Sequence, residues 1–337
     1  MSLENIIAKS IKENNNPIGF DVFMNQALYH QEFGYYRSNK TIFGHKGDFI
    51  TSPEVSDLFG FCLARQCKQV LDGGDILEFG AGSGILAAQT LFELGRLKSL
   101  PKKYFIIELS AKLRFTQKET IKKILPELLD RVEWLTELPK EFKGVVIANE
   151  VLDALPVKRF KKESNSFKEE KVTFYKNNFC WIDVDADDQL IDNLTRLEKK
   201  LLTPFPESYY SEININLKVW LNSIQSIIKK GVILLIDYGY SMSDYYHNEK
   251  SDGNLLCHYR HYVHNDPFFY PGLQDITTCV NFTAVAEYAE EIGMNISGYT
   301  NQTYFLFGCG LENLVPEMNL LDSKSQTKVS QELRTLT

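Results

Sequence analysis

Three glycines at alternate positions form the most informative motif of this sequence. Gly80, Gly82 and Gly84 follow a short apolar run at 75–79 and open an amphipathic stretch at 84–97. A backbone without Cβ atoms can turn sharply and lie against a ligand, and the first N–H groups of a helix are free to bind one. The spacing therefore predicts a strand, a glycine turn and a helix that bind a nucleotide-like ligand.

Two acidic residues indicate which ligand this is. Glu78 precedes the first glycine by two residues, and Glu108 directly follows the next apolar run at 103–107. A carboxylate at 78 suits a cationic group, and one at 108 can accept both hydroxyls of a ribose. A dinucleotide loop has its third glycine where this chain has Ile85. These features favour S-adenosylmethionine (SAM) over a dinucleotide, and a plain turn with surface acids is the remaining alternative.

A tryptophan is placed to contact the adenine of such a ligand. Trp134 lies in a short run at 132–135, which we expect to form the third strand. It can stack on the adenine or wall its pocket, and a role in the hydrophobic core is the alternative.

The residues after the fourth apolar run, at 145–148, are suited to hold a methyl acceptor. Methyl transfer needs the nucleophile in line with the methyl group and water kept out. For an arginine acceptor, two carboxylates would bind the guanidinium bidentately. Glu150 and Asp153 are three residues apart, which places them on the same side of a helical turn. They are the predicted clamp, and Asn149 is predicted to touch the amino-acid part of SAM or a substrate donor. N-capping by Asn149 or Asp153 is the alternative.

A turn-rich block at 47–54 contains polar residues beside Phe49 and Ile50, which solvent loops seldom need. We interpret this block as a lid over the cofactor, with Asp48 and Glu54 as further candidates for the catalytic site.

A stretch at 239–281 is rich in Tyr, His and Asp. We predict that His258, Tyr259 and Arg260 line a substrate groove and that Asp237, after the apolar run at 231–236, faces the site. Four histidines gather at 247, 258, 261 and 264, but their spacing is not that of a metal site and methyl transfer needs no metal. No metal is therefore expected.

Short apolar runs alternate with helical patterns along the chain, which predicts parallel strands buried on both faces. The expected architecture is a doubly wound, Rossmann-like α/β sheet of the class I SAM-methyltransferase type. The long interval at 157–212 is read as an inserted subdomain, in which 171–175 and 179–184 flank Lys176-Asn177-Asn178 as a hairpin. The expected parts are an N-terminal helical and lid segment (1–60), the core (61–156 with 213–312, including the insertion 239–281), the subdomain (157–212) and a helical tail (313–337).

Several blocks together resemble the MidA family of SAM-dependent methyltransferases. They include Pro17–His30, Gly47–Ser56, Ala148–Val157, Ile236–Tyr240, Cys257–His261 and Pro271–Thr277. That family is related to the mitochondrial complex I assembly factor that dimethylates an arginine. The resemblance covers about 17 to 312. It implies a protein arginine methyltransferase whose partner is a respiratory complex I subunit of the 49-kDa (NuoD) type.

The chain departs from the family near its end, because members continue into a further strand beyond the helix at 331–337. We place the sixth strand near Thr303–Phe307. Either the strand that usually inserts beside it comes from elsewhere, or the sheet edge is incomplete, and an incomplete edge would favour a homodimer.

The charge, hydropathy and cysteine spacing of the chain bear on its binding partners and its cellular compartment. A net charge of −7 argues against a nucleic-acid-wrapping protein, and no apolar run reaches the length of a membrane span. The six cysteines contain no C-x-x-C pair, which predicts reduced, mostly buried thiols. With no signal or transit peptide recognised, a cytoplasmic protein is expected. A small-molecule methyltransferase and a SAM-binding assembly factor without transfer activity are the alternative functions.

Overall fold

The computed structural model describes residues 2–37, 48, 51–315 and 322–337. The chain forms two compact units. The first unit contains Met1–Lys40, Glu150–Gln225 and Asp237–Asn295, and the second contains Thr41–Asn149, Ser226–Ile236 and Ile296–Thr337. These boundaries differ from the expected ones, because the segments 157–212 and 239–281 belong to the same unit.

The second unit contains a sheet of five parallel strands in the order β10-β5-β2-β3-β4. The strands are β2 (Asp75–Phe79), β3 (Tyr104–Ile107), β4 (Val132–Leu135), β5 (Phe142–Asn149) and β10 (Ile228–Ile236). Each one contains an apolar run singled out in the sequence. The prediction of a doubly wound α/β sheet is confirmed.

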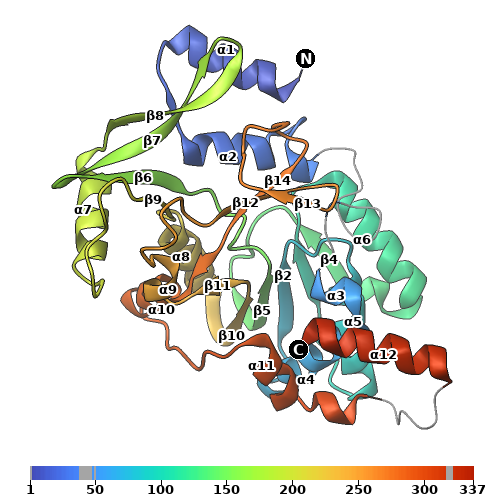
Figure 1. The fold of residues 1–337 in the computed structure, drawn as a ribbon. Coiled ribbons are helices and arrows are strands. Elements are labelled where there is room, and N and C mark those ends of the chain that lie inside the picture. Colours follow the sequence, from blue (N-terminus) through green and yellow to red (C-terminus); the bar gives the residue numbers. More distant parts are fainter. Residues whose placement is uncertain (1, 38–47, 49–50, 316–321) are drawn as a thin grey trace. The chain divides into compact units, whose positions relative to one another are not determined.

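Helices cover this sheet through apolar faces. They include α4 (Asp57–Val70), α5 (Ile85–Arg96) and α6 (Ala111–Ile124), seen beside the strands in Figure 1. Ser56 caps α4, because its hydroxyl accepts a hydrogen bond from the Leu58 N–H. This cap separates α4 from the short α3 (Ser52–Val55).

The strand order reverses between β2 and β5. The chain runs from β2 outward to β3 and β4, then returns to the other side of β2 with β5. In open α/β sheets ligands bind outside the carboxyl ends of the strands at such a reversal. The glycine turn after β2 and Asn149 at the end of β5 both lie at this point, since Phe79 pairs with Ala148.

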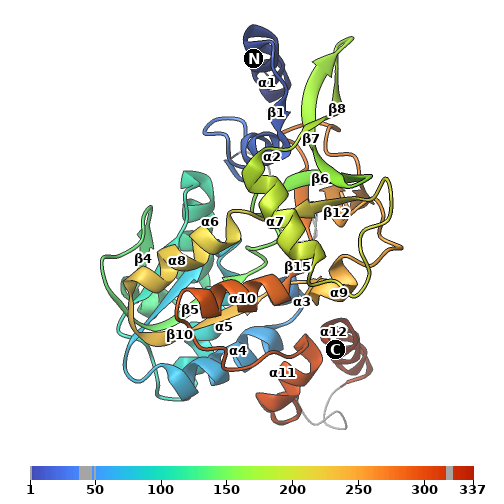
Figure 2. The ribbon, with the colours of Figure 1, turned by 90° about the vertical axis from the view of Figure 1, so that its left-hand side faces the viewer.

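The prediction of a strand near Thr303–Phe307 is wrong, because these residues belong to helix α11 (Gln302–Gly308). The Asn301 side chain accepts a hydrogen bond from the Tyr304 N–H and so starts a helix. Helix α12 (Ser323–Leu336) lies beside α11, and Gln302 Nε2 donates to the Leu336 carbonyl over 2.9 Å (Figures 1 and 2). Within the described residues, β10 is therefore an edge strand.

The first unit contains a second sheet, in which β8 (Asn178–Asp185) pairs antiparallel with β7 (Ser166–Tyr175). The expected hairpin is confirmed, and Lys176 and Asn177 adopt positive φ angles of 47° and 65° in its turn, as a two-residue hairpin turn requires. Figure 1 shows helix α1 (Leu3–Asn14) beside this hairpin. The other strands of the sheet are β1 (Ile18–Gly19), β6 (Lys158–Glu163) and β9 (Tyr210–Ile213).

Two smaller sheets complete the first unit. β12 (Leu255–Tyr259) pairs with β13 (Tyr262–His264) and β14 (Asp275–Thr278), and β11 (Gly239–Tyr240) pairs with β15 (Val280–Asn281). The remaining elements that the structure describes are α2 (Phe20–Tyr29), η1 (Tyr35–Arg37), η2 (Pro126–Arg131), α7 (Asp188–Glu198), α8 (Leu217–Ile227), α9 (Met242–Tyr245), α10 (Phe282–Glu291) and η3 (Leu311–Asn313).

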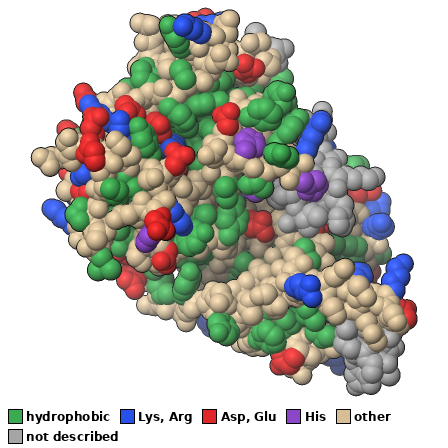
Figure 3. Space-filling view, viewed as in Figure 1, with side chains coloured by type: hydrophobic (Ala, Val, Ile, Leu, Met, Phe, Trp, Pro, Cys, Tyr) green, Lys and Arg blue, Asp and Glu red, His purple; other side chains and the backbone are tan. Residues whose placement is uncertain are grey.

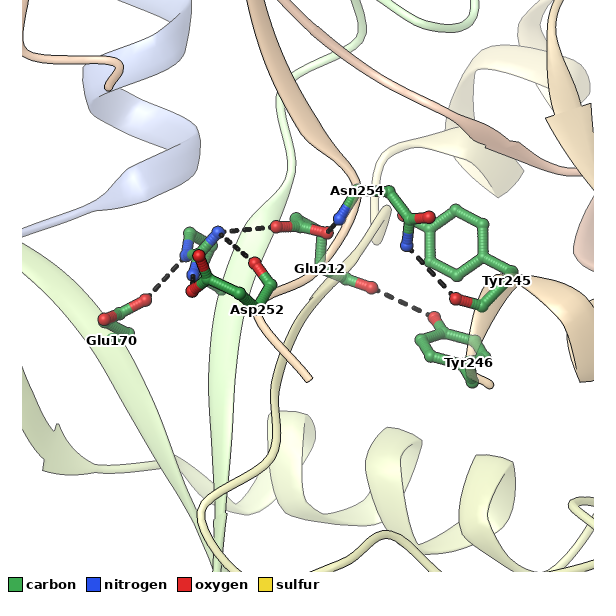
Figure 4. A network of polar contacts seen from close by, with 7 residues as sticks. Glu170, Glu212, Tyr245, Tyr246, Asp252 and Asn254 are labelled. Atoms are coloured by element: carbon green, nitrogen blue, oxygen red, sulfur yellow. Dashed lines mark hydrogen bonds and ion pairs between the residues drawn. The ribbon is translucent and has the colours of Figure 1, made fainter. Parts of the chain in front are cut away.

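A buried arginine links the two inserted segments of the first unit (Figure 4). Arg159 is 4% exposed and donates to carboxylate oxygens of Glu170 and Glu212 over 2.6 Å each. Glu212 also accepts a hydrogen bond from the Asn254 N–H, and Asp252 lies 3.7 Å from the guanidinium. Because buried charges must be paired, this network fixes the segment before β12 against β6, β7 and β9.

Candidate active site

The glycine turn owes its composition to backbone conformation and to close packing. Gly80, Gly82 and Gly84 have φ angles of 58°, 51° and 85°, in the left-handed region that disfavours other residues. A Cβ atom on Gly84 would lie 2.8 Å from the Cα of Gln117 on α6. Side chains are therefore absent at these three positions of the turn, and α5 begins immediately after it at Ile85.

Gln117, which the sequence analysis missed, organises the residues around this turn. It is fully buried, and its Nε2 donates to the Gly82 carbonyl and to Glu108 Oε2, over 3.1 Å each. Its Oε1 accepts a hydrogen bond of 2.9 Å from Trp134 Nε1. The sequence signal was slight: Gln117 lies four residues from both Leu113 and Ile121, on the buried face of α6.

Glu108 and Trp134 are thus both tied to the glycine turn. Glu108 is 8% exposed, and its Oε1 accepts the Ser110 N–H over 2.8 Å. Trp134 is half-buried and packs against the core of the second unit. This agrees with the core role that the sequence left open, and the contact of Trp134 with adenine stays a prediction.

Glu78 lies deeper than the sequence suggested. Its side chain is 2% exposed, and Oε2 accepts a hydrogen bond of 2.8 Å from the hydroxyl of Tyr104. Burial raises the pKa of Glu78 to about 7, although the hydrogen bond from Tyr104 acts in the opposite direction. Burial thus favours the protonated form of this carboxyl, and a nearby cation would favour its ionised form.

Asn149 ends β5 at the reversal of strand order and carries an unused acceptor. Its Oδ1 is buried and has no hydrogen-bond partner among the residues that the structure describes. Buried polar atoms in folded proteins nearly always have a partner. The atom therefore indicates a place where a ligand can donate a hydrogen bond.

The expected lid segment reaches the glycine turn through Glu54. Its Oε1 accepts a hydrogen bond from the hydroxyl of Ser83, which lies between Gly82 and Gly84. Asp48 is buried, with 7% of its surface exposed. The rest of the block at 47–50 lies outside the described residues.

In the first unit, a closely bonded group surrounds Asp153. Asp153 is 4% exposed, and its Oδ2 accepts a hydrogen bond from the hydroxyl of Tyr238. Its Oδ1 is buried without a partner among the described residues. Burial raises the pKa of Asp153 to about 6, and the bond from Tyr238 opposes this rise. Tyr238 carried no recognisable signal in the sequence beyond its place after Asp237.

Asp237 acts on the backbone of the same turn. Its Oδ2 accepts the N–H groups of Leu152 and Asp153 over 2.9 and 3.2 Å, and its Oδ1 accepts the N–H of Tyr238 over 2.9 Å. Burial raises the pKa of Asp237 well above its ordinary value, and the neighbouring carboxyls of Asp153 and Glu150 raise it further. The structure thus brings the three predicted acids into one electrostatic group.

Glu150 and Asp153 belong to the same electrostatic group, but the prediction that they lie on one side of a helical turn is wrong. Glu150 has a φ angle of 51°, and residues 150–156 form bends and turns with no helix. The spacing argument for a helical turn therefore does not apply. The conformation of this segment is fixed instead by the hydrogen bonds that the backbone N–H groups of Leu152 and Asp153 donate to Asp237.

The predicted groove residues lie on one hairpin. His258 and Tyr259 belong to β12, and the guanidinium carbon of Arg260 lies 5.2 Å from the ring centre of Tyr259. Among the described residues, no group of three His, Cys, Asp or Glu side chains is arranged to hold a metal ion. Nor does any described helix have the length and apolar character to cross a membrane. The prediction of free, mostly buried thiols is confirmed, with Cys62, Cys67, Cys257 and Cys309 buried.

The described residues of the second unit fit a ligand of the expected kind. They offer a glycine-rich turn at the start of α5, an unused acceptor on Asn149, and carboxyl groups on Glu78 and Glu108. The Asn149 oxygen and the carboxyl groups of Glu78 and Glu108 are suited to a ligand with cationic and hydroxyl groups.

Comparisons with known proteins agree with this fit. Residues 60–300 match the sequence model of a family described as S-adenosyl-L-methionine-dependent methyltransferases. A crystal structure of a Burkholderia thailandensis protein bound to S-adenosyl-homocysteine is 34% identical, with a TM-score of 0.91, and the match covers 99% of this chain and 87% of that chain. A native structure from the same organism is 33% identical, with a TM-score of 0.88 and the same coverage.

Curated relatives carry more specific names. The chain is 25% identical over 357 residues to the mitochondrial protein arginine methyltransferase NDUFAF7 of Danio rerio, covering 94% of this chain and 78% of that protein. It is 26% identical over 365 residues to the Homo sapiens protein of the same name, covering 95% and 76%.

Proposed function

Because the chain belongs to a family of S-adenosyl-L-methionine-dependent methyltransferases, we propose that its methyl acceptor is an arginine side chain of a protein. SAM is the cofactor, and it supplies an activated methyl group when bound. The observation that carries the proposal is Asp153, a buried carboxyl with one oxygen that has no donor among the described residues. The relatives named protein arginine methyltransferases support it.

A guanidinium supplies what Asp153 lacks. Its N–H groups form a fork that matches a carboxylate, and its cationic charge would favour ionised Asp153. Glu150 is the second member of the proposed clamp. Asp237 does not need to touch the substrate, because its three backbone hydrogen bonds hold the turn that carries Asp153. The carboxyls would orient the guanidinium and localise a lone pair on the attacking nitrogen.

The other predicted site residues are proposed to bind the cofactor, to belong to the catalytic site or to line the substrate groove. The residues proposed to bind the cofactor are Glu78, Gly80, Gly82, Gly84, Glu108, Trp134 and Asn149. Asp48 and Glu54 of the lid segment are proposed as further catalytic-site residues. The substrate groove contains His258, Tyr259 and Arg260.

The proposed acceptor protein is a respiratory complex I subunit of the 49-kDa type. Incubation of the protein with this subunit and methyl-labelled SAM, followed by peptide mass spectrometry, tests both parts of the proposal. We expect the label on an arginine. Label on lysine, or transfer only to small molecules, would refute the arginine assignment. SAM binding without any transfer would favour an assembly factor.

A further inference from the structure

The β12–β13 hairpin of the first unit borders a hollow of about 500 Å³, within the size range of ligand pockets. In Figure 3, hydrophobic side chains and histidines gather over β12, β13 and β14. The hollow is lined by Tyr259, Arg260, Tyr262, His264, Asp266 and Phe269. Tyr259 and Arg260 were predicted from the sequence to line a substrate groove, and His264 was named there only as a member of the histidine cluster.

Aromatic rings define the shape of the hollow. The ring centre of Phe269 lies 5.8 Å from that of Tyr259 and 5.4 Å from that of His264, with interplanar angles of 82° and 83°. Such edge-to-face contacts hold the rings upright against one another. Tyr262 is 76% exposed and Phe269 41% exposed. Exposed aromatic rings are typical of protein recognition sites, since they bury large apolar areas at little entropic cost.

His264 adds a hydrogen-bond donor whose partner is missing. Its Nδ1 accepts the N–H of Asp266 over 3.2 Å, so in the neutral ring the proton is on Nε2. Nε2 is buried and has no acceptor among the described residues. A buried donor without an acceptor is unfavourable, and a carbonyl oxygen from outside would satisfy it.

The turn of the hairpin is conformationally costly. Arg260 and His261 have φ angles of 50° and 65°, where Asn-Gly is the usual pair in a two-residue hairpin turn. Strained backbone in bulky residues tends to occur at functional sites. A tight two-residue turn also leaves the hairpin little freedom, so the rings beside it are held in place.

We propose that this hollow binds an aromatic side chain of the protein substrate, at a position other than the methylated residue, while His264 Nε2 donates to a backbone carbonyl of the same segment. The inference rests on the proposal that the acceptor is a protein. Arg260 and Asp266 line the hollow with opposite charges, so neither a cationic nor an anionic side chain is favoured. A neutral ring with an adjacent carbonyl fits the apolar walls and the unused donor on His264.

Binding of short peptides tests the hollow without any methyl transfer. The probes are N-acetylated, C-amidated pentapeptides, one of sequence Gly-Gly-Phe-Gly-Gly and one of five glycines, titrated by NMR against the full chain saturated with S-adenosyl-homocysteine. We expect the Phe peptide to bind at least tenfold more tightly than the glycine peptide. Tyr262→Ala should remove this preference, and Tyr175→Ala, a change of a 64% exposed tyrosine on β7, should leave it intact. Equal binding of the two peptides, or a preference that survives Tyr262→Ala, would overturn the proposal.

Kinetics with the 49-kDa-type subunit separate this inference from the proposed function. Tyr262→Ala should raise the KM for the subunit at least tenfold and leave kcat and SAM affinity unchanged. An unchanged KM in an active enzyme overturns the hollow as a substrate site. If wild-type protein methylates no protein arginine but still binds the Phe peptide selectively, the proposed function fails and the peptide site remains.

Discussion

Replacing Glu78 by Gln should change how the stability of the protein depends on pH. The pKa of this buried carboxyl lies near 7 in the folded protein, against an ordinary value of 4.5. At about 1.4 kcal/mol per pH unit, this difference amounts to roughly 3 kcal/mol. Below pH 4.5 the group is protonated in both states and its contribution to stability is fully present. Between pH 4.5 and 7 the unfolded chain ionises first, so that contribution is lost as pH rises.

The assay is urea unfolding of wild type and Glu78→Gln without ligand, from pH 4.5 to 8. Subtracting the two curves cancels the other titrating groups. We expect the variant to gain roughly 3 kcal/mol relative to wild type across this range, with a plateau above pH 7. Tyr104→Phe removes the hydrogen bond that lowers the pKa of Glu78, so it should move that plateau to higher pH. If the difference in unfolding free energy between the two proteins does not change with pH, the pKa of Glu78 is not raised by burial.

Other substitutions test the turn, the acid group and the buried network. Gly84→Ala should weaken SAM binding in calorimetry and lower the Tm more than Gly293→Ala does. Both glycines have φ near 85°, but of the two only Gly84 has neighbouring atoms where the new Cβ would lie, and equal losses of Tm would contradict this. Tyr238→Phe should move the acidic limb of the kcat/KM profile upward from about pH 6, since it removes a hydrogen bond that lowers the pKa of Asp153; an unmoved limb would separate Asp153 from activity. Arg159→Met should cost about 3–5 kcal/mol in urea unfolding by leaving buried carboxylates unpaired, and a loss below about 1 kcal/mol would show that water reaches them.

The central sheet was predictable because its strands are buried on both faces. Val145, Val146, Ile147 and Ala148 are fully buried in β5, and such continuous apolar runs are visible in the sequence. The glycine turn was equally visible, since positive φ angles at three alternate positions leave glycine as the favoured residue. Local chemistry determines these features, so one sequence is sufficient to predict them.

Features that depend on distant partners were missed or misread. The contacts of Gln117 with Gly82 and Glu108 join residues far apart in the chain, and no local pattern predicts them. The strand expected at Thr303–Phe307 came from a family pattern, and it overlooked the cap at Asn301 that begins a helix. In the same way, the helical turn expected at Glu150 gave way to a turn fixed by Asp237.

The most direct test of the account is single-turnover methyl transfer by wild type and by Asp153→Asn. Labelled SAM is bound first, the 49-kDa-type subunit is added, and the rate of label transfer to arginine is measured together with the Kd for SAM. Loss of one partner of a buried charge pair costs about 3 kcal/mol, so transfer should fall about 100-fold while the Kd for SAM changes less than about twofold. Equal transfer rates in the two proteins would contradict the assignment of Asp153 as the group that holds the acceptor.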